Sequence, residues 1–197
     1  MAEEPSDFVR RLAIGERLPL GDLLEDPLFP FEGDVRVKTL DAPVLPEPER
    51  HGVDAEACHL CRDGSDHVIW EDAGWRVLSA PEPHGLPMVA VLAPRAHHDL
   101  EDLPPELAAG FGTMIQRLAR AVGRLEGVGR VHVNRWGDGS HHVHLWFLAR
   151  PQGMWQMRGA MLAIWDDLLP KVPAEEWAAS RRTVAAALAA DGGRAIV

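Results

Sequence analysis

The sequence predicts an α+β domain, in which an antiparallel sheet of about five strands is covered by one long helix. Two patterns support this: short strand-like runs separated by turns, and one long amphipathic stretch between the third and fourth runs. The chain has 197 residues, of which 46% are hydrophobic. That is enough to bury a sizeable core without disulfides.

The first three strands are expected at residues 67–70, 75–80 and 88–93. Each run is short and rich in β-branched, aromatic or aliphatic residues, which is typical of strands. Residues 71–74 (EDAG) separate the first two runs and provide a plausible hairpin turn. These runs therefore predict a hairpin followed by a third neighbouring strand.

The long helix is expected to begin near Asp102, with Pro104 and Pro105 in its first turn, where proline is tolerated. Gly127 and Gly129 follow its end, and two further strands are expected at 129–134 and 141–150. Apolar residues recur along the helix at spacings of three or four, which predicts one buried face: Leu107, Phe111, Met114, Leu118, Val122 and Leu125.

The chain divides into an acidic, proline-rich arm (1–50), a core domain (51–155) and a C-terminal helical extension (156–197). Residues 1–60 carry 14 acidic and 6 basic side chains, and hence most of the net charge of −10. We expect the arm to lie on the body of the protein or on a partner subunit. Two helical stripes are predicted in the extension: Met157, Met161, Ile164 and Leu168, and then Trp177, Val184 and Leu188.

Composition argues against several classes of protein. No apolar run approaches the roughly 18 residues of a membrane span, so no membrane association is expected. The N-terminus lacks the apolar segment of a signal peptide, so we expect a cytoplasmic protein. The acidic balance argues against general nucleic-acid binding, although it leaves room for a local anion site.

Cys58 and Cys61 form a C-x2-C pair. On spacing alone this pair is half of a zinc site, a redox pair or two inert thiols. The turn residues that follow argue against a redox pair, which would be expected to have a helix directly after it. A zinc ion would need two further ligands, and the His97-His98 pair is one source of them.

Residues 137–147 (GDGSHHVHLWF) are the most informative segment. In a strand, alternation would put Ser140, His142, His144 and Trp146 on one polar and aromatic face. The opposite face, mostly apolar, would lie against the long helix. An exposed sheet face with incidental histidines is the plainer interpretation. Two histidines at i and i+2 after a glycine-rich turn favour a binding or catalytic site.

Several motifs together resemble the histidine triad (HIT) superfamily across roughly residues 55–155. The run from His142 to Leu148 (HVHLWFL) is similar to the H-x-H-x-H-x-x signature, with Trp146 in place of the third histidine. The other motifs occur in the order of that family: the C-x2-C pair, Pro94-Arg95-Ala96-His97, Asp102-Leu103, Asn134 and Met154-Trp155.

The resemblance implies a HIT-like fold in which His144 attacks the phosphorus of a nucleotide. It implies a nucleotide or nucleotide conjugate as ligand, contacted by Asn134, Gly139, Ser140 and Trp146. In zinc-containing relatives the ligands of a structural zinc correspond to Cys58, Cys61, His97 and His142. HIT proteins commonly pair, so a homodimer is expected.

Two departures from the family pattern keep two functions open. Trp146 offers one N–H donor, no acceptor and no exchangeable proton, and Asp138 places an anion beside the expected phosphate site. The first function is a nucleotide hydrolase or nucleotidyltransferase that forms a nucleotidyl-histidine on His144. The second is a catalytically weak or inactive nucleotide-binding or interaction module. No catalytic role is assigned to the other histidines considered: His51, His59, His67, His84, His132 and His141.

Overall fold

The computed structural model describes residues 7–62 and 64–197. They fall into two compact units, Met1–Glu49 and Arg50–Val197, and each is described by itself. The first unit contains α1 (Asp7–Arg10) and a 3-10 helix at Gly21–Glu25. It has little core, because no residue from 9 to 49 is buried. The expected contact of this arm with the body or a partner stays a prediction.

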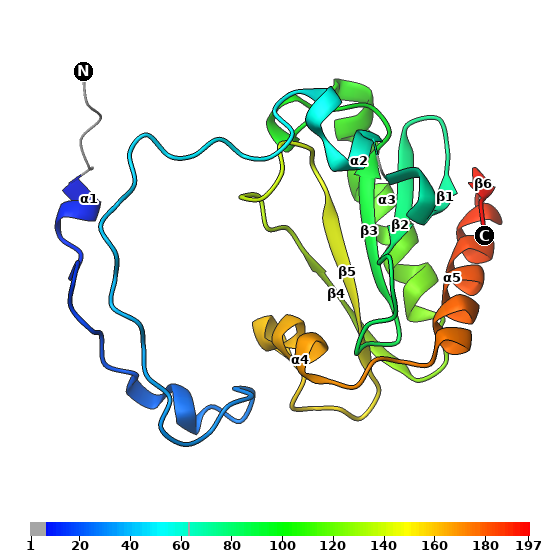
Figure 1. The fold of residues 1–197 in the computed structure, drawn as a ribbon. Coiled ribbons are helices and arrows are strands. Elements are labelled where there is room, and N and C mark those ends of the chain that lie inside the picture. Colours follow the sequence, from blue (N-terminus) through cyan, green and yellow to red (C-terminus); the bar gives the residue numbers. More distant parts are fainter. Residues whose placement is uncertain (1–6, 63) are drawn as a thin grey trace. The chain divides into compact units, whose positions relative to one another are not determined.

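The described part of the second unit is built on a six-stranded antiparallel sheet with the order β4-β5-β3-β2-β1-β6 (Figure 1). The α+β class is confirmed, and the sheet has one strand more than the five expected, because the C-terminus adds β6 to one edge. The strands are β1 (Val68–Glu71), β2 (Trp75–Ser79), β3 (Val89–Pro94), β4 (Val128–Asn134), β5 (Leu145–Pro151) and β6 (Arg194–Ala195).

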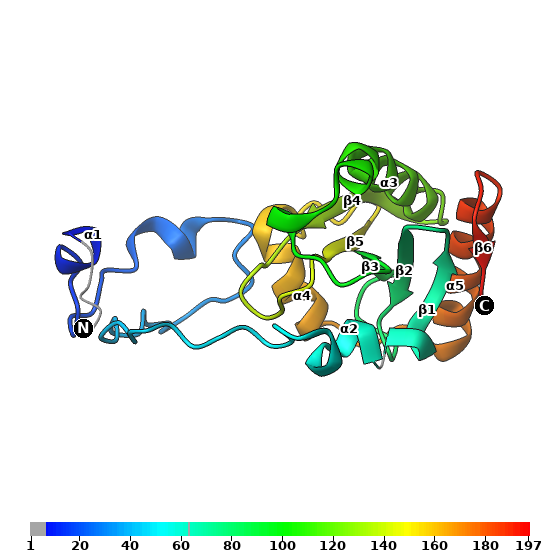
Figure 2. The same ribbon diagram turned by 90° about the horizontal axis from the view of Figure 1, so that it is seen from above.

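One face of the sheet packs against α3 (Pro105–Gly123) and α5 (Ala174–Ala189). The side chains alternate along each strand, so every second residue points to this face. Phe147 on β5 is fully buried there, and Leu118 of α3 belongs to the same cluster. Figure 2 shows α3 on one side of the sheet and α2 (His59–Arg62) on the other.

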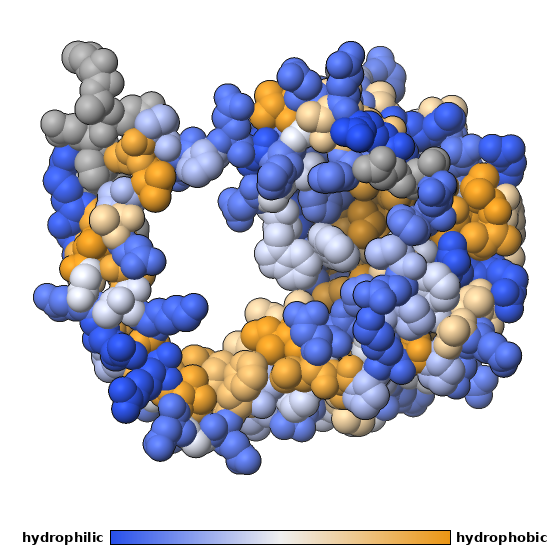
Figure 3. Space-filling view, viewed as in Figure 1, coloured by the Kyte–Doolittle hydropathy of each residue, from blue (hydrophilic) through white to orange (hydrophobic). Residues whose placement is uncertain are grey.

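The other face packs against α4 (Leu162–Leu168) and carries the candidate site. The expected stripe in this region is only partly correct: Met157 is buried and Met161 and Ile164 are half-buried, but Leu168 is exposed. Leu162, which was not part of the stripe, is buried. A 3-10 turn at Gly159–Met161 precedes α4 and shifts the helical phase. Figure 3 shows the resulting apolar surface over α4. Among the described residues, no helix combines the length and apolar character that crossing a membrane requires.

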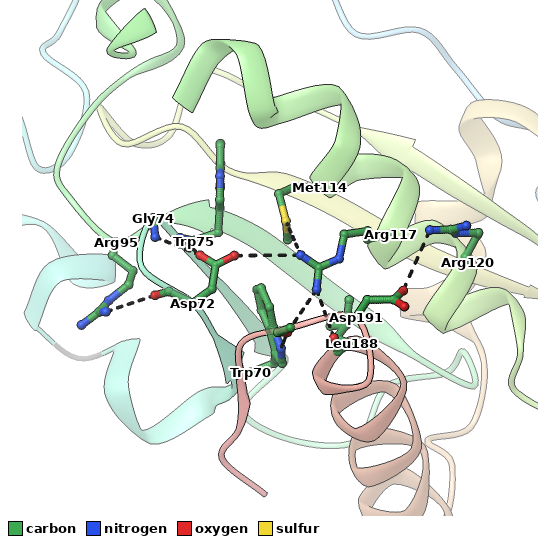
Figure 4. Close-up of polar contacts among 11 residues, drawn as sticks. Trp70, Asp72, Gly74, Trp75, Arg95, Met114, Arg117, Arg120, Leu188 and Asp191 are labelled. Carbon is green, nitrogen blue, oxygen red and sulfur yellow. Dashed lines mark hydrogen bonds and ion pairs between the residues drawn. The ribbon is translucent and has the colours of Figure 1, made fainter. Parts of the chain in front are cut away.

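Arg117 of α3 ties the C-terminal helix and strand to the core (Figure 4). Its guanidinium donates to the carbonyl oxygens of Leu188 (3.0 Å) and Gly192 (3.1 Å). It also lies 5.1 Å from the ring centre of the buried Trp70, whose indole N–H donates to Gly192 as well. The last residues of the chain are therefore part of the same folded unit.

Candidate functional site

Four potential metal ligands converge from three separate segments. Cys58 and Cys61 lie at α2, His97 follows β3, and His142 precedes β5. Their ligand atoms all lie within 4.8 Å of one another. The Sγ atom of Cys61 is 3.4 Å from His97 Nδ1 and 3.5 Å from His142 Nδ1, and Cys58 Sγ is 3.4 Å from His142 Nδ1. The structure therefore brings all four predicted ligands together.

The spacing of these atoms fits zinc. Zn–S bonds of about 2.3 Å and Zn–N bonds of about 2.0 Å at tetrahedral angles give S···N edges of about 3.5 Å. The observed S···N distances of 3.4–3.5 Å agree with such a tetrahedron. Two thiolates and two imidazoles form a complete ligand set with no open position, which is the arrangement of a structural zinc site.

The remote nitrogens of both histidines are held by backbone carbonyls. His142 Nε2 lies 3.1 Å from the Pro94 oxygen, and His97 Nε2 lies 3.3 Å from the Val53 oxygen. A carbonyl only accepts, so each Nε2 carries the proton and each Nδ1 presents its lone pair to the sulfurs. Burial lowers the pKa of His142 to about 4, which keeps the ring neutral as a ligand must be.

Cys58 and Cys61 need a neighbouring cation if both are to be deprotonated as metal ligands. Burial, followed by the neighbouring Cys58, raises the pKa of Cys61, because two adjacent thiolates in a desolvated site repel each other. A divalent ion reverses this effect, since it favours the deprotonated ligands. The donor set, the distances and the oriented histidines thus agree on zinc, and they favour the metal interpretation over a redox pair or inert thiols.

His144 lies two residues beyond the zinc ligand His142. Its Nδ1 is 2.9 Å from the backbone oxygen of His142, so Nδ1 donates and Nε2 is left with a free lone pair. The half-buried His144 ring lies 6.2 Å, centre to centre, from that of Trp146. The backbone oxygen of one zinc ligand therefore orients the ring of His144.

A cavity of about 390 Å³ opens in front of His144. Gly139, Ser140, His144 and Trp146 are among its lining residues. Asn134 does not line it, but this residue pairs directly with Trp146 across β4 and β5, which puts both side chains on one sheet face. The structure thus brings Gly139, Ser140 and Trp146 to the cavity that His144 lines, and it places Asn134 beside Trp146 but outside the lining.

The segment before β5 is not a strand, contrary to the expectation of a strand from 141. β5 begins only at Leu145, because the preceding backbone bonds to loops and not to a ladder. His141 N donates to the His51 oxygen (2.9 Å), His51 N donates to the Gly139 oxygen (3.2 Å), and Val143 N donates to the His98 oxygen (2.8 Å). The alternation still holds for Leu145, which faces the helices.

A buried carboxylate fastens these loops to one another. Asp99 accepts from Arg50 (2.7 Å), Arg135 (3.1 Å) and the backbone N–H of Leu100 (2.7 Å). Burial alone would raise the pKa of Asp99, but these hydrogen bonds outweigh it and hold the pKa below its usual value. Arg50 also donates to the Gly137 oxygen (2.9 Å), so the glycine-rich turn is anchored to the loop after β3.

The structure adds histidines to the cavity that sequence reasoning left without a role: His51, His59, His67 and His84. His84 Nδ1 donates to Asp166 of α4 at 2.7 Å, and the other Asp166 oxygen accepts from Leu86 N at 3.0 Å. This bond, more than any other contact, raises the pKa of His84. The partners are 82 residues apart, so no local pattern could have joined them.

No protein-family model matches the sequence, and no curated protein matches it. Among solved structures, the chain is similar to a zinc-bound histidine triad family protein from Mycobacterium smegmatis, with 25% identity, a TM-score of 0.51, and coverage of 70% of this chain and 96% of that one. A histidine triad protein from Marinobacter aquaeolei VT8 has 21% identity, a TM-score of 0.49, and coverage of 68% and 97%. A Hit-like protein from Bartonella henselae has 16% identity, a TM-score of 0.49, and coverage of 71% and 99%.

The first of these proteins is described as zinc-bound, and this chain brings together a Cys2His2 cluster that could hold the same metal. The unit Arg50–Val197 therefore has the fold of the histidine triad proteins. It also contains a structural zinc site, one ligand of which, His142, lies two residues before His144.

Proposed function

We propose that this protein binds a nucleotide in the cavity in front of His144 and acts as a hydrolase or nucleotidyltransferase on a nucleotide phosphate ester, anhydride or phosphoramidate. The observation that carries the proposal is the 2.9 Å hydrogen bond from His144 Nδ1 to the His142 carbonyl. In the neutral ring this bond places the proton on Nδ1 and leaves the Nε2 lone pair free, and the cavity that His144 lines is large enough for part of a nucleotide.

In the first step, the Nε2 lone pair of His144 forms a bond to the α-phosphorus, and the bond from phosphorus to the leaving group breaks. The leaving group departs with the electron pair and takes up a proton. The imidazole ring gains positive charge, which the His142 carbonyl stabilises through Nδ1–H. Water, or another nucleotidyl acceptor, then attacks phosphorus, the N–P bond breaks, and His144 is regenerated.

The turn before His144 supports phosphate binding. In the described part of the chain, neither the Gly139 N–H nor the Ser140 N–H has a backbone acceptor, so both donors are available. Two adjacent backbone donors form a site suited to an anion. We further propose that the Ser140 hydroxyl and Asn134 add hydrogen bonds to phosphate or ribose, and that Trp146 packs against the ligand.

A second candidate function is nucleotide binding without turnover. Trp146 favours it, because this half-buried indole takes the third signature position and has no proton to exchange with a leaving group. Asp138, exposed in the adjacent turn, adds negative charge near an incoming phosphate. A protein of this kind would bind the nucleotide in the same cavity but form no covalent intermediate.

Trapping the intermediate separates the two functions. The protein is incubated with adenylated and uridylylated substrates, quenched at alkaline pH, and searched by mass spectrometry for an acid-labile nucleotidyl adduct. We expect the adduct on residue 144, its loss in His144→Ala, and its retention in His98→Ala, whose side chain does not line the cavity. Zinc content and melting temperature of each variant show that it is folded. Nucleotide binding with neither an adduct nor turnover would contradict the enzyme function and support the non-catalytic binding module.

We also propose a cytoplasmic homodimer. Strand β4 forms one edge of the sheet, and Val133 on it is exposed, so a second copy has a strand to pair with. Light scattering on the purified protein tests this directly. A monomeric mass at micromolar concentration would contradict the dimer.

A further inference from the structure

A second cavity, of about 710 Å³, lies at the other end of β4 and β5 from His144. Its lining is basic: Arg130 and His132 come from β4, Arg150 from β5, and Arg158 from the segment before α4. Neither aspartate nor glutamate occurs among the described residues that line it. We call it the arginine pocket and define it by Arg130, Arg150 and Arg158.

Among the described residues, the three guanidinium groups of this pocket donate hydrogen bonds only to backbone carbonyls. Arg130 donates to the Gly129 oxygen (2.8 Å) and Arg158 to the Trp155 oxygen (2.8 Å). Arg150 donates to the oxygens of Pro151 (3.0 Å) and Met154 (3.1 Å). Within residues 7–62 and 64–197, none of the three has a carboxylate within ion-pair distance.

The missing counter-charge matters most at Arg150, because this arginine is buried. Only 7% of the residue is exposed, and its Nε has no hydrogen-bond partner in the part of the chain that the structure describes. A buried charge without a compensating partner costs free energy. Carboxylates are plentiful in a chain of net charge −10, and other arginines, such as Arg50 and Arg194, are paired with them. A small anion from solution would supply the missing charge.

Two further contacts describe the shape of the pocket. A Cβ on Gly129 would lie 2.9 Å from the Gln152 backbone and 3.2 Å from the Arg150 guanidinium, so only glycine leaves this wall as it is. Trp155 is 67% exposed, and the Arg158 guanidinium stacks on its ring at 3.6 Å. His132 has its pKa lowered by burial and then by Arg150, which agrees with an uncompensated positive field.

We propose that the arginine pocket is a second binding site, for a small molecule that carries a diphosphate or similar multivalent phosphate group. Planar guanidinium groups match phosphate oxygens in charge and in bidentate geometry. The shared chemistry is the phosphate group, which inorganic pyrophosphate and nucleoside diphosphates both offer. The exposed face of Trp155 would add stacking for a base. This site is independent of the function proposed for His144.

The test uses the full-length protein and isothermal titration calorimetry with pyrophosphate. The exposed Arg130 and the half-buried Arg158 are both replaced in Arg130→Gln/Arg158→Gln, and Arg150 is kept because it also holds the turn after β5. The matched control, Arg124→Gln/Arg182→Gln, removes the same charge at exposed positions outside the pocket. We expect the pocket variant to bind at least about tenfold more weakly, and the control to remain within about twofold of the parent.

Two arms identify the source of the phosphate. The affinities of the parent and of Trp155→Ala are compared for ADP and for pyrophosphate. If the substitution weakens ADP binding more than pyrophosphate binding, the ligand is a nucleotide. If it changes neither affinity, the ligand is an inorganic phosphate compound. ADP could also bind in the cavity at His144. The comparison therefore uses only the part of the calorimetric signal that the Arg130→Gln/Arg158→Gln variant loses. No pyrophosphate binding at millimolar concentration, or equal binding by the pocket and control variants, would overturn the proposal.

Discussion

Replacing Arg117 with methionine is expected to destabilise the protein much more than the same change at Arg120, three residues along α3. Arg117 is 14% exposed and bonds the Leu188 and Gly192 carbonyls at the end of α5 (Figure 4). Arg120 is 58% exposed and makes a 4.0 Å ion pair with the exposed Asp191. The two variants remove the same charge from the same helix, so their difference reports the buried contacts.

The magnitude follows from the interactions that the Arg117 guanidinium makes. Each hydrogen bond from the charged group is taken at the low end, about 1 kcal/mol, because both carbonyls keep another donor. The cation–π contact with the buried Trp70 adds about 0.5–1 kcal/mol. Methionine retains most of the aliphatic packing. Arg117→Met should therefore cost about 2.5–3 kcal/mol, against less than about 1 kcal/mol for Arg120→Met.

Denaturant unfolding and calorimetry measure this difference. For a chain of this length, 1 kcal/mol moves the melting temperature by about 2–4 °C, so Arg117→Met should melt roughly 5–12 °C below the parent. Arg120→Met should stay within about 3 °C. Equal shifts in the two variants would refute the conclusion that Arg117 ties the C-terminal segment to the core.

Three further predictions concern the zinc site, the cavity and a tight turn. Cys61→Ser should lose its equivalent of zinc, measured by mass spectrometry of the metal, and melt more than about 10 °C lower, because structural zinc contributes about 10 kcal/mol or more to a small domain; full zinc retention would contradict the ligand set. The Asp166 contact raises the pKa of His84, so it stabilises the fold below the unfolded pKa of histidine and this stabilisation is lost as the pH rises through the raised folded value. The stability gap between the parent and Asp166→Asn should thus be larger at pH 6 than at pH 9 in urea titrations, and a constant gap would show that His84 charge is irrelevant. Gly52→Ala should lower stability and zinc retention, because Gly52 has φ +68° and its Cβ would lie 2.8 Å from Cys58 Cα, whereas Gly139→Ala meets nothing within 4 Å and should keep its zinc.

The strands and the long helix could be predicted because local patterns determine them. The β2, β3 and α3 segments combine strong periodicity with clear turns, and the structure has them within a few residues of the expectation. β6 could not be found in this way, since it has two exposed residues held by β1. The α4 stripe failed because a 3-10 turn changed the helical phase just before it.

In the candidate site, too, some features follow from local sequence motifs and others from contacts between distant residues. The zinc ligands were identified through short motifs, and the structure brings all four together. The geometry also supplies what no motif encodes: the carbonyl that orients His144, and the Asp166 contact that reaches the cavity from α4. Contacts between residues far apart in the sequence depend on how the helices pack over the sheet, and single-sequence patterns carry no information about that packing.

Asp99 has a consequence for dynamics. This one carboxylate joins the segment at Arg50, the metal-binding loop after β3 and the glycine-rich turn, through Arg50 and Arg135. Loops that share a buried anchor fluctuate together and not independently. A ligand that rigidifies the glycine-rich turn should therefore also slow amide hydrogen exchange around His97, on the far side of that carboxylate.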